Sequence, residues 1–192
     1  MCIRDSRKAG NFVIIRVDAN SERMPLTIAD ADIEKGTITL VVQKVGLSST
    51  KLCNLNEGDE IHDVVGPLGN PTHIENFGTV LCAGGGVGVA PMLPIIKALK
   101  AAGNRVLSVI AGRSKDLVIM EDEVRASSDE LIIMTDDGSY GEKGVVTVGM
   151  EKLIQQEHID KAFAIGPPIM MKFCCLLTQK YNLPTDVSLN TI

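Results

Sequence analysis

The glycine-rich segment CAGGGVGVAPMLP, residues 82–94, contains residue types suited to binding the phosphates of a nucleotide. Glycines allow a ligand to approach the backbone closely, and the start of a following helix offers unpaired N–H groups to a diphosphate. The usual fingerprint G-x-G-x-x-G fits badly, because Val89 or Pro91 takes the place of the third glycine. The alternative is a tight turn with nothing bound, but four glycines in five positions exceed what a turn needs. We therefore predict a nucleotide-binding loop, with Pro91 in the first turn of the helix.

Small or polar residues also follow three later apolar segments. These are Gly112-Arg113-Ser114, the run TDDGS at 135–139, and Gly166-Pro167-Pro168. If the apolar segments are parallel strands, these residues gather with the glycine-rich loop at the edge where such sheets bind ligands. The alternatives are a helix cap and turn for TDDGS, and a helix start with proline for the last segment.

Arg113 and Ser114 stand where an acidic residue would hold the adenine-side ribose of a dinucleotide. A cation there could meet a 2′-phosphate, which would favour NADP. It could equally stack on adenine or pair with Asp116, and the sequence leaves the three open.

In the first part of the chain, the segment ERMPLTIAD contains a second candidate for phosphate binding. The guanidinium of Arg23 can bind phosphate oxygens in a fork, and Pro25-Leu26-Thr27 would form a rigid extended backbone beside a hydroxyl. The alternative is an edge strand with a surface arginine.

Composition excludes several classes of protein. The net charge is -5 with no long basic run, and there is no Trp, which disfavours nucleic-acid binding. No apolar segment is long enough to span a membrane. The five cysteines form no C-x-x-C pair, which predicts reduced thiols in a cytoplasmic protein and no zinc or iron–sulfur site within the chain. His62, His73 and His158 are expected at the surface.

The pattern of apolar residues predicts two domains. Short alternating segments with turns predict a small antiparallel β-barrel over residues 7–76, with a short helix near 48–55 capped by Ser48 or Ser49. From Thr79 onward, five apolar strands alternate with helical segments at 90–103, 115–126, 144–156 and 167–181. This predicts a doubly wound, five-stranded parallel sheet over 77–192. The first six residues look foreign to the strand pattern, and we set them aside.

Taken together and in this order, the motifs RMPLT, GGGVGVAP and GPPIMM resemble the ferredoxin–NADP reductase superfamily. Within it, PLTIAD, GPLGNP, AGGGVGVAPMLPI, TDDGSYGEKGVVT and VSLN are similar to the electron-transfer subunit of dihydroorotate dehydrogenase. They are closer still to the FAD subunit of NADH-dependent ferredoxin–NADP oxidoreductase, also called the small subunit of sulfide dehydrogenase. The resemblance runs from about Lys8 to Ile192.

The resemblance implies an FAD-binding barrel, an NAD(P)-binding sheet, and hydride transfer from NAD(H) or NADP(H) to FAD. It implies FAD contacts at Arg23, Pro25, Leu26, Thr27, Val42, Gln43, Ser48 and Ser49. It implies NAD(P) contacts at Gly84, Gly85, Gly86, Val87, Gly88, Arg113, Asp136, Asp137, Gly138, Ser139, Gly166, Pro167 and Met170, with Pro91 shaping the loop. No side chain is expected to act as a catalytic acid or base.

The resemblance also implies a larger catalytic redox subunit as partner and, indirectly, ferredoxin or a similar electron carrier. Members of the family continue into a cysteine cluster that holds a [2Fe–2S] centre, and they begin with a further strand or two. Neither is found in this sequence, so we expect a fragment whose barrel is truncated at its N-terminal side. A fragment that binds NAD(P) without catalysis is one alternative, and a hydrolase or methyltransferase, which would lack the G-x-S-x-G motif, is another.

Overall fold

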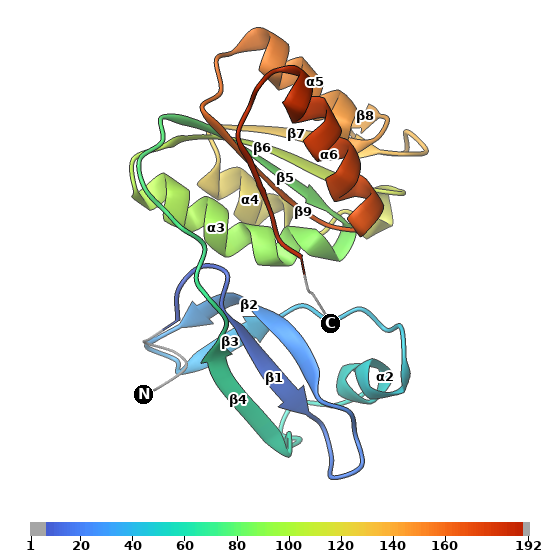
Figure 1. Ribbon diagram of the computed structural model, residues 1–192. Helices are drawn as coiled ribbons and strands as arrows, with labels where there is room; N and C mark the ends of the chain where they lie inside the picture. Colours follow the sequence, from blue (N-terminus) through green and yellow to red (C-terminus); the bar gives the residue numbers. More distant parts are fainter. Residues whose placement is uncertain (1–6, 190–192) are drawn as a thin grey trace. The chain divides into compact units, whose positions relative to one another are not determined.

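The two predicted domains correspond to two compact units of structure (Figure 1). The computed structural model describes residues 7–189, and the six N-terminal residues that we set aside lie outside them. One unit ends at His73 and the other begins at Ile74, whereas the predicted boundary falls between residues 76 and 77.

The first unit is a four-stranded antiparallel sheet in the order β3-β2-β1-β4. Along β1, inward-facing Val13 and Ile15 are fully buried between half-buried neighbours, as expected for a strand with one face on a core. Val17 and Ile28 complete this core. The strands are β1 (Phe12–Arg16), β2 (Met24–Asp32), β3 (Thr37–Leu40) and β4 (Asp63–Leu68).

The helix α2 (Leu47–Cys53) follows the sheet's third strand. Gly46, not Ser48 or Ser49, is the N-cap residue, so the predicted cap is wrong. The Ser49 hydroxyl instead folds back from the first turn and accepts the N–H groups of Val45 and Gly46 at 3.1 and 3.0 Å. The serine therefore still satisfies backbone donors at the start of the helix, from inside the first turn.

The second unit is a parallel sheet in the order β10-β9-β5-β6-β7-β8. The predicted fold class is confirmed, but the sheet has six strands rather than five. The additional strand, β8, has only two residues, Glu142 and Lys143, and carries no apolar pattern that would have predicted it. The strands are β5 (Thr79–Gly85), β6 (Arg105–Gly112), β7 (Glu130–Thr135), β8 (Glu142–Lys143), β9 (Lys161–Ile165) and β10 (Thr185–Val187).

Four helices cover the two faces of this sheet, with α3 and α4 on one face and α5 and α6 on the other (Figure 1). Their bounds are α3 (Val89–Ala101), α4 (Glu121–Ser127), α5 (Val146–Gln156) and α6 (Pro168–Lys180). The predicted helix at 115–126 is split, because a 3-10 turn, η2 (Lys115–Leu117), is followed by Met120 in the left-handed region with φ 56°. No helix among the described residues is long and apolar enough to cross a membrane.

The strand order reverses between β5 and β9. From β5 the chain proceeds through β6 and β7 toward one edge of the sheet, then returns to lay β9 and β10 on the other side of β5. The helices that follow β5 and β9, α3 and α6, depart to opposite faces of the sheet (Figure 1). In open α/β sheets, ligands bind at such a point, beyond the carboxyl ends of the strands. The glycine-rich loop and Gly166 lie at this point of the sheet.

Candidate functional site

The glycine-rich loop joins β5 to α3 through a 3-10 turn, η1 (Gly86–Gly88). Gly86 has a positive φ of 53°, which favours glycine. A Cβ atom on Gly88 would lie 2.5 Å from the carbonyl oxygen of Ile165, and one on Gly85 would collide with the sulfur of Met170. The collision at Gly88 is with backbone, so packing within the chain requires glycine there, whereas at Gly85 the flexible Met170 side chain can move aside. The number of glycines therefore does not by itself demonstrate a bound ligand, contrary to the argument from the sequence.

The start of α3 offers N–H groups toward this loop. The helix begins at Val89, its N-cap residue is Gly88, and no side chain caps it. Pro91 is the third residue of the helix, so it lies in the first turn as predicted. The Val89 N–H already donates to the carbonyl oxygens of Gly86 and Val87 in η1, and Pro91 has no N–H. The positive end of the dipole of this 13-residue helix nevertheless suits a diphosphate.

Beyond β6, the exposed Arg113 guanidinium makes no ion pair or hydrogen bond within residues 7–189. The predicted alternative of an Arg113–Asp116 ion pair is thus not formed. Asp116 instead accepts a hydrogen bond of 2.7 Å from the Ser114 hydroxyl. A carboxylate therefore does lie just after the second strand of the parallel sheet, three residues beyond Arg113, which stands where the acid was expected.

The loop that follows β7 lies directly beside this segment. The N–H groups of Asp136 and Asp137 donate to the carbonyl oxygens of Gly112 and Arg113, both at 3.2 Å, and so extend the strand pairing. The N–H of Ser139 donates to Asp137 Oδ1 at 2.9 Å. Hydrogen bonds from the hydroxyl and N–H of Ser139 lower the pKa of Asp137 below its ordinary value. The side chains of Asp136, Asp137 and Ser139 are exposed at the carboxyl edge of the sheet.

At the end of β9, Gly166 and Pro167 lead into α6. The side chain of Met170, in the first turn of α6, lies beside Gly85 and Gly166. The Met170 thioether occupies the space in which Cβ atoms on Gly85 and Gly166 would lie. The structure thus brings to one edge of the second unit every residue that we predicted to contact NAD(P).

In the first unit, Arg23 precedes β2, is exposed, and makes no ion pair or hydrogen bond among the described residues. Pro25 and Thr27 follow on one side of the strand, while the side chain of Leu26 packs on the core. Residues 24–27 of β2 pair only with β1, whereas β3 pairs with residues 28–32. The segment that follows Arg23 is therefore locally an edge, which agrees with the alternative of an edge strand with a surface arginine.

The remaining residues predicted to contact FAD lie around α2. Val42 and Gln43 belong to an extended segment after β3, half-buried and exposed respectively. Ser48 and Ser49 are buried, and the Ser48 hydroxyl accepts the N–H of Glu22 at 3.2 Å. Both hydroxyls therefore serve the local fold: that of Ser48 joins α2 to the segment that carries Arg23, and that of Ser49 bonds to the backbone at the start of the helix.

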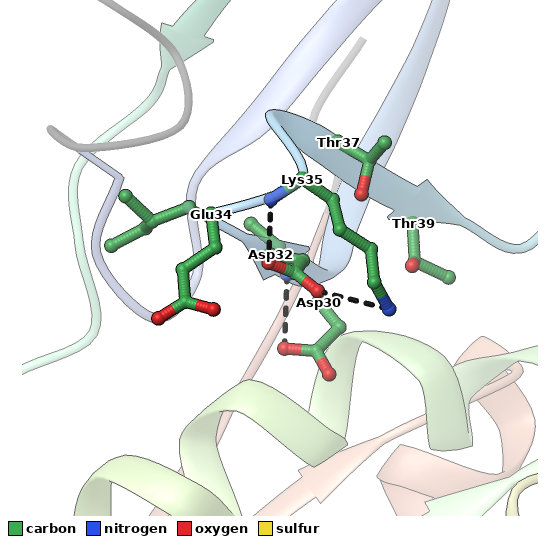
Figure 2. Close-up of a pocket in the computed structure, with 8 residues that line it drawn as sticks. Asp30, Asp32, Glu34, Lys35, Thr37 and Thr39 are labelled. Atoms are coloured by element: carbon green, nitrogen blue, oxygen red, sulfur yellow. Dashed lines mark hydrogen bonds and ion pairs between the residues drawn. The ribbon is translucent and has the colours of Figure 1, made fainter.

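One pocket lies where sequence reasoning predicted no site. It is a cavity of about 550 Å³ at the turn between β2 and β3 (Figure 2). The Lys35 ammonium lies 3.3 Å from Asp32, and a hydrogen bond from the Lys35 N–H lowers the pKa of that carboxyl. The sequence signal here is the charged segment DADIEKG, residues 30–36, whose composition is also typical of a turn.

The described cysteines and histidines form no reactive cluster. Cys53, Cys82, Cys174 and Cys175 are free, and burial raises the pKa of Cys82 and raises that of Cys174 to about 12, which keeps both thiols protonated. His62, His73 and His158 are exposed, as predicted. Within residues 7–189 no group of three or more His, Cys, Asp or Glu side chains is arranged to hold a metal ion.

No family model matches the chain, but individual proteins do. It is 51% identical over 185 residues to a Thermotoga maritima protein described as a homolog of the dihydroorotate dehydrogenase B (NAD(+)) electron transfer subunit, covering 96% of the chain and 65% of that protein. It is 33% identical to the electron transfer subunit itself from Bacillus caldolyticus, covering 97% and 73%.

Among solved structures, it is similar to an NADH-dependent reduced ferredoxin-NADP oxidoreductase described in connection with flavin-based electron bifurcation. The TM-score is 0.93 and the identity 46%, over 99% of this chain and 68% of the other.

These relatives confirm the resemblance that the motifs predicted. The chain spans about two thirds of the length of the Thermotoga relative and somewhat more of the Bacillus one. Identity above 30% extends over nearly the whole of it. The chain belongs to the family of dihydroorotate dehydrogenase B electron transfer subunits.

Proposed function

We propose that this chain is part of an FAD-containing subunit that moves a hydride between a nicotinamide nucleotide and FAD, and passes electrons to a partner subunit. The observation that carries the proposal is the gathering of four loops at one edge of the second unit, around the N-terminal end of α3. Family membership supports the same assignment, since its relatives are named electron transfer subunits.

Residues of the first unit have the chemistry that FAD requires. The unpaired guanidinium of Arg23 suits the diphosphate, and Pro25 and Thr27 present a rigid backbone and a hydroxyl on the same side of β2. Leu26, Val42, Gln43, Ser48 and Ser49 would shape the surrounding surface. When bound, the flavin supplies the two-electron to one-electron chemistry, and the protein supplies position and electrostatics.

Residues of the second unit suit NAD(H). Its diphosphate would lie on Gly84–Gly88 and the start of α3, with Gly166, Pro167 and Met170 beyond the end of β9. Asp116, Asp136 and Asp137 surround the region expected for the adenosine. Carboxylates accept hydrogen bonds from ribose hydroxyls and repel a 2′-phosphate, so these three residues favour NAD(H) over NADP(H) despite the nearby Arg113.

We further propose a larger redox subunit as partner, with ferredoxin or a similar carrier beyond it, and a cytoplasmic location. Free, buried thiols are typical of reducing compartments and support the last point. The described residues do not fit a [2Fe–2S] centre, because they include no suitable cluster of cysteines.

The partner has two candidate identities. The curated relatives are named for dihydroorotate dehydrogenase, whereas the structural relative at 46% identity is an NADH-dependent ferredoxin-NADP oxidoreductase. We favour the second because the motifs resemble it more closely. Co-purification of the tagged chain from its native cells, followed by identification of the bound subunit, would decide between them.

Reconstitution tests the central proposal. The purified chain mixed with FAD and freed of excess should retain a yellow chromophore, which should bleach anaerobically when NADH is added. NADPH should bleach it more slowly at equal concentration. Failure to retain flavin, both by this chain and by a longer natural form of it, would overturn the proposal.

A further inference from the structure

Tyr140 lies at the meeting point of three segments beyond the carboxyl ends of β6 and β7. These segments are the 3-10 turn η2, the first turn of α4, and the loop between β7 and β8 that carries Asp136–Ser139. The sequence analysis assigned Tyr140 no role. Its contacts nevertheless join all three segments at the edge where we place the adenosine of the nucleotide.

The backbone of Tyr140 is fixed to the end of β7. Its N–H donates to Thr135 Oγ1 at 3.2 Å, and the same hydroxyl donates to the Tyr140 carbonyl at 2.6 Å. Thr135 is fully buried, so this anchor belongs to the core of the unit. Thr135 precedes the loop residues 136–139, and its hydroxyl bonds to the backbone of Tyr140, which follows them. One threonine therefore joins the two ends of this loop.

The side chain of Tyr140 joins this loop to α4 and to η2. Its hydroxyl donates to Glu121 Oε1 at 3.1 Å, and Arg125 Nη2 donates to the same oxygen at 2.9 Å. The ammonium of Lys115 lies over the ring, 5.3 Å from its centroid, which suits a cation–π interaction. The Lys115 N–H also donates to Ser139 Oγ at 2.9 Å, so η2 contacts both the ring and the loop.

These contacts orient the exposed side chains of the loop while leaving them accessible. Asp136 and Asp137 point to solvent, whereas Tyr140 and Glu121 are half-buried behind them. A binding loop held in place before the ligand arrives loses less conformational entropy on binding. Without the tyrosine hydroxyl, α4 would no longer be joined to the loop by a side-chain hydrogen bond among the described residues.

We propose that Tyr140 is a positioning residue for the adenosine half of the nicotinamide nucleotide, acting through Glu121, Lys115 and the Asp136–Ser139 loop. This inference rests on the proposed function of the same edge of the sheet. It assigns Tyr140 no contact with the reacting atoms. Its effect should consequently fall on nucleotide affinity and not on the rate of flavin reduction once the nucleotide is bound.

The chain provides a matched control for the test. Tyr181, the only other tyrosine, donates its hydroxyl to Glu151 Oε1 at 3.0 Å, just beyond the carboxyl end of α6 and far along the chain from the loop. Tyr140→Phe and Tyr181→Phe thus each remove one tyrosine–glutamate hydrogen bond from the same unit. Any general loss of stability should be similar in both variants.

Binding of NADH and of AMP is measured by calorimetry on the full 192-residue chain carrying FAD. Tyr140→Phe should weaken both ligands by about tenfold, the loss of one hydrogen bond to a charged group, and Tyr181→Phe should leave them within about twofold of the original. Glu121→Gln should weaken binding similarly, and the double variant Tyr140→Phe/Glu121→Gln little further, because the two residues act through one contact. Flavin reduction at saturating NADH should be unchanged.

Each other outcome is decisive. If Tyr140→Phe binds both ligands as Tyr181→Phe does, or lowers the limiting rate of flavin reduction without weakening binding, the positioning role is wrong. If the unaltered chain binds neither NADH nor AMP, the proposed function of this edge fails first, and the inference fails with it.

Discussion

At the scale of single residues, the glycine-rich loop shows how one sequence signal can have two causes. A Cβ atom on Gly88 would collide with the backbone at the end of β9, so this residue would be glycine even if nothing bound there. The sequence could place the loop correctly because strand, glycines and proline are local features. It could not reveal the contacts with residues 165–170, because these depend on how the strands are ordered in the sheet.

Asp116 provides a residue-scale prediction about nucleotide choice. Its carboxylate, held by the Ser114 hydroxyl, should repel a 2′-phosphate. Asp116→Asn should therefore improve the affinity for NADPH relative to NADH by about fivefold, the effect of one unit charge at close range in water. Competitive titration with the two nucleotides measures the ratio. Glu123→Gln, the same charge change at an exposed position on α4, should leave it unaltered, and equal shifts in both variants would contradict the assignment.

At the scale of elements, predictability followed the apolar pattern. The long strands β5, β6, β7 and β9 are buried, nearly continuous apolar runs, and the sequence identified each of them. Strand β8 was missed because Glu142 and Lys143 are both exposed and pair only through their backbone. The prediction of one helix over 115–126 was wrong because Met120 adopts a left-handed conformation that interrupts it. Such a conformation usually falls on glycine, so nothing in the sequence indicated it.

Helix α2 provides an element-scale prediction. The Ser49 hydroxyl accepts the N–H groups of Val45 and Gly46 and is buried, so nothing replaces it when it is removed. Ser49→Ala should lower the free energy of unfolding of the first unit by about 1–2 kcal/mol. Urea unfolding followed by circular dichroism measures this. The neighbouring Thr50→Ala, at an exposed position of the same turn, should cost less than about 0.5 kcal/mol. Equal costs would show that the hydroxyl does not stabilise the start of the helix.

At the scale of the whole molecule, the order of motifs gave the fold class, while the geometry of the site came only from the structure. Arg113, Asp136 and Gly166 are far apart in sequence, and only the parallel register brings the ends of their strands to one edge. Parallel alternation made that edge predictable in outline. Asp116 was not predicted to face the ribose, because the usual spacing places the acid directly after the strand. Only the structure shows that the Ser114 hydroxyl holds the Asp116 carboxylate near that position.

Stability of the whole molecule should decrease in acid. The hydrogen bond from Lys51 lowers the pKa of Asp18 to about 2, Arg125 lowers the pKa of Glu121, and Lys100 lowers that of Asp129. Since folded-state values lie below the ordinary ones, the stabilisation is fully present above about pH 4.5 and is lost as pH falls through the folded values.

Urea midpoints should accordingly stay constant between about pH 7 and 5 and decline toward about pH 2.5. Lys51→Gln, which removes the principal partner of Asp18, should reduce the acid-dependent part of the decline. A midpoint that is equal at neutral and strongly acidic pH would show that these pairs contribute nothing to stability.

The Met170 side chain, placed between Gly85 and Gly166, has a mechanical consequence. The backbone on either side of it is held by the hydrogen bonds that pair β5 with β9 along their length. Methionine has three rotatable side-chain bonds and a polarisable sulfur, so it can change shape at little cost. The space between Gly85 and Gly166 can therefore be filled by Met170 in more than one conformation, while the pairing of β5 with β9 is unchanged.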